Sequence, residues 1–166
     1  MMLRLFFAFL LILVVMPASY SHEGGTLSAG ISMNSVVPTD LMGTWRVVSK
    51  LIETNSPENF KEVGVVIWNL SRRGDVISLC NPFTGAQAFV NVEYVKNNTV
   101  KFSKEGNYED TNLIDSVEIT INGDTFSGEN YLIMKEVSPL RDNTKPEKRA
   151  TYAVSGKRIF GNGIME

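Results

Sequence analysis

Three carboxylates near one turn signal are the side chains of this sequence best suited to acid–base chemistry. Asp115, Glu118 and Glu129 lie on the two segments that flank Asn122-Gly123. A carboxyl group that faces an apolar interior can act as a general acid. Carboxylates in such positions more often form the solvated face of a strand. Both alternatives stay open, with the solvated face preferred.

The single histidine limits the kinds of catalytic and metal site that the sequence can form. His22 is the only histidine, and it falls outside the folded domain that the sequence predicts. Ser-His, Cys-His and His-ligated zinc sites all need a histidine. Glu105, Glu109 and Asp110 could form a calcium loop, but their spacing lacks the EF-hand pattern. We therefore expect no catalytic residue, no metal ion and no cofactor.

Charge and cysteine usage limit the partners. The net charge is -2, from 16 basic and 18 acidic residues, and neither sign forms a run. Nucleic-acid-binding domains normally carry a basic patch, so we expect no nucleic-acid partner. Cys80 is the only cysteine, and we expect a small buried residue on a strand, with pairing between chains as the alternative. The oligomeric state stays open.

The N-terminus has the pattern of a secretory signal peptide. Arg4 gives a short positive start, residues 5–16 are almost entirely apolar, and small residues end the run before position 22. Such a stretch is shorter than the roughly 20 residues that span a bilayer. We predict a signal peptide over residues 1–21 and a secreted or periplasmic protein without a stable membrane span after cleavage. An uncleaved anchor is the alternative.

The rest of the chain predicts a flexible lead followed by one all-β domain. Residues 22–39 are rich in Gly, Ser and Thr and lack periodicity, as in a linker. Residues 40–162 alternate apolar and polar side chains between short turns. The expected strands cover residues 44–52, 63–70, 76–80, 86–95, 113–121, 124–134 and 149–159, with one more after Asn98. About eight strands favour an antiparallel up-and-down barrel, because closure removes exposed edges; an open sandwich is the alternative.

Two hairpins allow the register to be predicted. A three-residue loop over residues 96–98 pairs apolar with apolar and charge with countercharge: Tyr94 with Val100, Val92 with Phe102, and Glu93 with Lys101. A two-residue loop would set Glu93 against Phe102 and is less favourable. A turn at Asn122-Gly123 pairs Ile119 with Phe126 and places Gly128 opposite Val117.

Two features then suggest a family. Gly43-Thr44-Trp45 opens the first strand, and Arg158 lies near the end of the last. With the barrel topology, this pattern resembles lipocalin-like, or calycin, domains, particularly small bacterial ones. The resemblance implies that Gly43, Trp45 and Arg158 close one end of the barrel, with the basic side chain across the Trp and Arg149 as its rival. The chain lacks the disulfide cysteines and the evident long C-terminal helix of animal lipocalins.

A barrel of this size either is filled by side chains or holds one small ligand. We expect a noncatalytic binding protein for a small hydrophobic or amphipathic molecule. The alternatives are a filled barrel with a structural or interaction role, and a cyclase or isomerase that uses a cavity carboxylate or Tyr. The expected ligand-lining residues are Val66, Trp68, Val90, Val92, Tyr94, Val100 and Phe102.

Overall fold

The computed structural model describes residues 32–108, 111–136 and 146–161, and they form an all-β fold. Nine antiparallel strands make one sheet. The strands are β1 (Gly43–Thr54), β2 (Val63–Arg73), β3 (Val76–Cys80), β4 (Gln87–Phe89), β5 (Asn91–Lys96), β6 (Thr99–Tyr108), β7 (Thr111–Asn122), β8 (Thr125–Glu136) and β9 (Lys148–Phe160). Two 3-10 turns, η1 (Met33–Val36) and η2 (Thr39–Leu41), precede β1.

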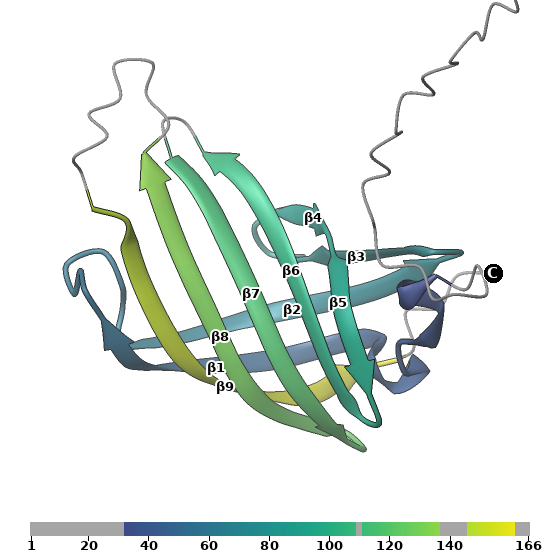
Figure 1. The fold of residues 1–166 in the computed structure, drawn as a ribbon. Helices are drawn as coiled ribbons and strands as arrows, with labels where there is room; N and C mark the ends of the chain where they lie inside the picture. The colour runs from purple at the N-terminus through teal and green to yellow at the C-terminus, as the bar shows by residue number, and fades with distance from the viewer. Residues whose placement is uncertain (1–31, 109–110, 137–145, 162–166) are drawn as a thin grey trace, which may run out of the picture.

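The sheet curls into a nearly closed barrel (Figure 1). Its two edge strands, β4 and β5, follow each other directly in the chain, and this brings the two edges of the sheet together. The strand order is β4-β3-β2-β1-β9-β8-β7-β6-β5, so the first and last strands pair in the middle. Only Val90 separates β4 from β5 in the chain, and its N–H donates to the Ile77 carbonyl at 2.9 Å. The structure therefore confirms the up-and-down barrel and divides the expected strand 86–95 at Val90.

Large side chains fill one end of the barrel. Trp45 is fully buried, and its ring centroid lies 5.1 Å from that of Phe126. Gly156 lies opposite Phe126 on β9, and a Cβ atom there would come within 2.2 Å of the Phe126 ring. The absent side chain at position 156 therefore makes room for the aromatic ring. Leu41 is also buried, so η2 contributes to this end.

Arg158, and not Arg149, lies over Trp45. Its guanidinium carbon is 4.2 Å from the centroid of the indole. Its Nη1 donates to the Met42 carbonyl at 2.7 Å, and its Nη2 donates to the Asp40 carbonyl. A positive charge over an aromatic face is attracted by the ring quadrupole. One side chain thus joins the last strand to the segment that enters the first.

The folded part of the chain begins before Asp40. Val37 is 2% exposed, although residues 22–39 were expected to form a flexible lead. Arg72 on β2 donates through Nη1 to the carbonyls of Asn34 and Val37, at 3.4 and 3.2 Å. Residues 32–39 therefore pack on the barrel. The predicted signal peptide and the start of the lead lie outside the described residues.

The loop between β5 and β6 is shorter than expected. Lys96 pairs directly with Thr99, so the turn is Asn97-Asn98, with Asn97 in the left-handed conformation at φ 54°. The three-residue loop was therefore wrong. A bulge between Val92 and Tyr94 absorbs Glu93 and restores the expected pairing of Val92 with Phe102. Bulges of this kind insert one unpaired residue into a strand.

The hairpin between β7 and β8 turns one residue later than expected. Asn122 pairs with Thr125, so the turn is Gly123-Asp124, with Gly123 at φ 58°. Gly128 consequently faces Ile119 rather than Val117. The predicted register of this hairpin was wrong, because Gly123 takes the first turn position rather than the second.

Replacing Gly128 by Ala should destabilise the barrel. A Cβ atom at Gly128 would lie 1.9 Å from the Glu118 carbonyl oxygen, and this backbone atom cannot swing away. We expect Gly128→Ala to lower the free energy of unfolding by about 2 kcal/mol or more, as overpacked cores do. Gly64→Ala is the control, because the nearest atom there is the Ser49 Cβ at 3.9 Å. Equal urea midpoints for the two variants would contradict the clash.

Replacing Arg158 should destabilise the filled end of the barrel. Arg158→Met loses two charged hydrogen bonds to carbonyls and the contact with Trp45. We expect the free energy of unfolding to fall by about 2–4 kcal/mol. Arg149→Met, at a side chain that is 55% exposed, should change it by about 0.5 kcal/mol or less. Chemical denaturation followed by Trp fluorescence measures both, and a comparable loss in the two variants would argue against the closure.

Candidate functional site

The other half of the barrel holds a cavity of about 310 Å³ that is partly open to solvent. Its apolar wall consists of Val66 and Trp68 on β2, Leu79 on β3, Leu113 on β7 and Leu132 on β8. These strands are neighbours in the sheet or face one another across the barrel. The cavity is therefore interior space that the side chains of this half do not fill.

Trp68 separates the cavity from the filled end. Its ring stacks on Phe126, with centroids 5.7 Å apart, and meets Phe102 edge-on at 6.3 Å. The same ring lines the cavity. Trp68 thus forms the floor of the cavity and rests on the aromatic rings of Phe126 and Phe102.

A polar group interrupts the apolar wall. Lys104 on β6 and Asp115 on β7 are register partners, and their side chains form an ion pair. The Nδ2 group of Asn130 on β8 donates to the other Asp115 oxygen and also to the Ser116 carbonyl at 3.2 Å. All three side chains line the cavity. The Asp115 side chain is 12% exposed, and a charge so far removed from water is tolerated only when it is well partnered.

The cavity continues toward a gap in the barrel wall between β4 and β6. Pairing between β5 and β6 ends at Asn91 and Ser103, so the edge of β6 beyond Ser103 has no strand partner on that side. β5 follows only part of β6, and β4 turns away from the rest (Figure 1). A second cavity of about 320 Å³ lies there, and Phe89, Glu105 and Gly106 line it together with five residues of the first.

The structure divides the seven expected ligand-lining residues into three groups. Val66 and Trp68 line the cavity. Val90, Val92, Val100 and Phe102 are buried in the packed core, at 0–6% exposure. Tyr94 lies on the outer face of the wall.

Tyr94 is displaced by the bulge at Glu93. Val95, and not Tyr94, pairs with Val100 and packs against the core. A hydrogen bond to Glu118, with smaller contributions from burial and the charges of Glu118 and Glu93, raises the pKa of Tyr94. Its hydroxyl therefore belongs to a polar network on the outer wall.

Sequence reasoning found one member of the polar group and missed two. Asp115 was a candidate carboxylate, and it is 8% exposed. Glu118 and Glu129, the other two candidates, are exposed and oppose each other across the hairpin. Lys104 and Asn130 were missed, although the period of two that puts Val100 and Phe102 inside also puts Lys104 inside.

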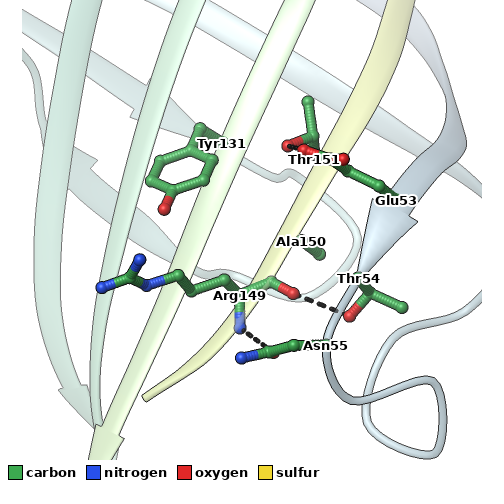
Figure 2. Close-up of a pocket in the computed structure, with 7 residues that line it drawn as sticks. All are labelled: Glu53, Thr54, Asn55, Tyr131, Arg149, Ala150 and Thr151. Carbon is green, nitrogen blue, oxygen red and sulfur yellow. Dashed lines mark hydrogen bonds between the residues drawn. The ribbon is translucent and has the colours of Figure 1, made fainter. Parts of the chain in front are cut away.

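A further pocket of about 410 Å³ lies where β1 and β9 shift register (Figure 2). Its polar groups hold the two strands together: the Arg149 N–H donates to Asn55 Oδ1, and Thr54 Oγ1 donates to the Arg149 carbonyl, each at 2.7 Å. Hydrogen bonds from Arg149 and Lys135 lower the pKa of the nearby Glu147. We interpret this pocket as the surface of a strand junction.

Comparisons with known proteins assign no family. No protein-family model, curated protein or solved structure matches the chain. Within the described ranges, no group of three or more His, Cys, Asp and Glu residues could hold a metal ion. The same residues include no helix with the length and apolar character to cross a membrane.

The Lys104–Asp115 pair should matter more for stability than its counterpart on the outer wall. Lys104→Met leaves the Asp115 carboxylate, with 12% of its side chain exposed, without its cationic partner. We expect a loss of about 1–3 kcal/mol in the free energy of unfolding. Lys101→Met, on the same strand, breaks the pair with Glu93, whose members are about one-third exposed, and should cost about 1 kcal/mol or less. Urea denaturation compares them, and equal losses would contradict a special role for the inner pair.

Proposed function

We propose that this chain is an exported, lipocalin-like protein that binds one small amphipathic molecule in its barrel without catalysing a reaction. The observation that carries the proposal is the cavity, whose apolar side chains are interrupted by the Lys104–Asp115–Asn130 group and by the polar residues Ser49, Asn81 and Gln87. Ligand pockets commonly combine apolar lining with a few placed polar groups. The signal-peptide pattern of residues 1–21 supports export.

The lipocalin-like assignment rests on the closure of the filled end. Gly43 has φ 130°, and a Cβ atom there would lie 2.1 Å from the Gly161 carbonyl oxygen and 2.8 Å from Arg158 Nη1. Trp45 lies directly under Arg158 and donates from its indole N–H to the Leu41 carbonyl at 2.9 Å. This combination of Gly, Trp and a basic residue on the last strand is the pattern that suggested the family.

The size of the cavity favours a short ligand. A volume of about 310 Å³ is near the lower end of the roughly 300–1,000 Å³ typical of ligand pockets. At about 30 Å³ for each non-hydrogen atom, as for water in the liquid, it accommodates about ten such atoms. A long lipid would have to extend through the gap between β4 and β6.

Binding fits the cavity better than either alternative. A barrel with a purely structural role has no need of a hollow half, since each unfilled volume costs packing energy. An acid–base enzyme needs a carboxyl or phenol group that is available to its substrate. Asp115, the carboxylate in the cavity, has both oxygens engaged by Lys104 and Asn130.

Titration with small amphiphiles tests the proposal. We expect alcohols, amides and acids of eight or nine carbons to change the fluorescence of Trp68 and to release or absorb heat in calorimetry. Leu132→Trp fills the cavity and should abolish the binding heat. Ile133→Trp, at the next position and therefore on the opposite face of β8, should preserve it.

Two results would oppose the proposal. One is the absence of both fluorescence change and heat for every member of the panel at millimolar concentration. The other is undiminished binding by Leu132→Trp when circular dichroism shows that the variant is folded, since the ligand would then lie elsewhere.

A further inference from the structure

The charges that face the cavity cancel one another. Lys104 and Asp115 are the ionisable residues that line it, and they are paired with each other. Glu105 adds a negative charge at the neighbouring gap. The wall therefore offers no uncompensated positive charge to an incoming anion.

A carboxylate ligand would meet an unfavourable environment there. It would add a negative charge beside the Asp115 carboxylate, in a space where Asp115 and Asn130 are each about 8% exposed. Burying a charge without a partner of its own costs several kcal/mol. Lys104 could donate to the ligand as well, but its single positive charge would then have to offset two carboxylates, the ligand's and that of Asp115.

Hydrogen-bond donors are nevertheless available. An ammonium group has three N–H donors, and the bond recorded for Lys104 among the described residues is the one to Asp115. Lys104 lines both the cavity and the gap. An uncharged hydroxyl or carbonyl oxygen can therefore accept from Lys104 without disturbing the ion pair.

From this arrangement we infer that the cavity selects an uncharged amphiphile, such as an alcohol or amide, over the carboxylate of the same chain length. Its oxygen accepts a hydrogen bond from Lys104, and its hydrocarbon chain lies against Trp68, Leu113 and Leu132. This inference rests on the proposed binding function and names its ligand class.

A direct test compares octan-1-ol, octanamide and octanoate on the full protein at neutral pH. By calorimetry, we expect both uncharged probes to bind the unmodified protein at least about tenfold more tightly than octanoate. Asp115→Asn removes the negative charge and leaves Lys104 as the single charge of the cavity. That variant should reverse the order, with octanoate bound more tightly than octan-1-ol.

Glu118→Gln is the matched control, because it removes the same charge from the exposed face of the same strand. It should keep the preference of the unmodified protein. Octanoate binding to the unmodified protein as tightly as octan-1-ol would overturn the inference while leaving the binding function intact. Failure of all three probes to bind would overturn the binding function itself. The comparison of octanoate with octan-1-ol in the unmodified protein tests the ligand preference even if Asp115→Asn does not fold.

Discussion

The pairing of the first strand with the last is the constraint on which the rest of this structure depends. β1 and β9 are neighbours at the middle of the sheet, and Trp45 and Arg158 are register partners within that pairing. Arg158 also binds carbonyls of the segment that leads into β1. Contacts between residues so far apart in sequence carry a large loop-closure entropy. The buried Trp45, which contacts Phe126 on β8, offsets part of that cost and fixes the geometry of one barrel end.

From the closed end, the aromatic side chains pack in successive layers as far as Trp68, and beyond it the barrel is not filled. Trp45 contacts Phe126, Phe126 stacks on Trp68, and Trp68 borders the cavity. Above this floor the inward positions carry Ser49, Leu113, Lys104 and Asp115, which do not fill the barrel. The division into a filled and a hollow half thus follows from where the aromatic residues occur along the strands.

The sequence was sufficient for the up-and-down order of the strands, but not for the division of residues 86–95 into β4 and β5 or for local register. Alternation of apolar residues predicted the strands, and Gly43, Trp45 and Arg158 indicated which residues to examine at the closed end. Pattern alone could not show that Glu93 is bulged, because a bulge moves every following side chain to the other face. That is why Tyr94 was expected inside and lies outside. Asn130 was missed because an amide at an inward position gives no signal until its partner on another strand is known.

The gap in the wall and the polar group have a common origin in the strand that changes partners. Residues 87–89 pair with β3 and residues 91–96 pair with β6, so β6 loses its neighbour beyond Ser103. Lys104 is the first residue past that point and faces both the interior and the gap. A charged side chain at a sealed inward position would be difficult to hydrate. At the gap, the Lys104 side chain remains 24% exposed to solvent and still pairs with Asp115. The same change of partner therefore opens the barrel and makes an ion pair tolerable at its wall.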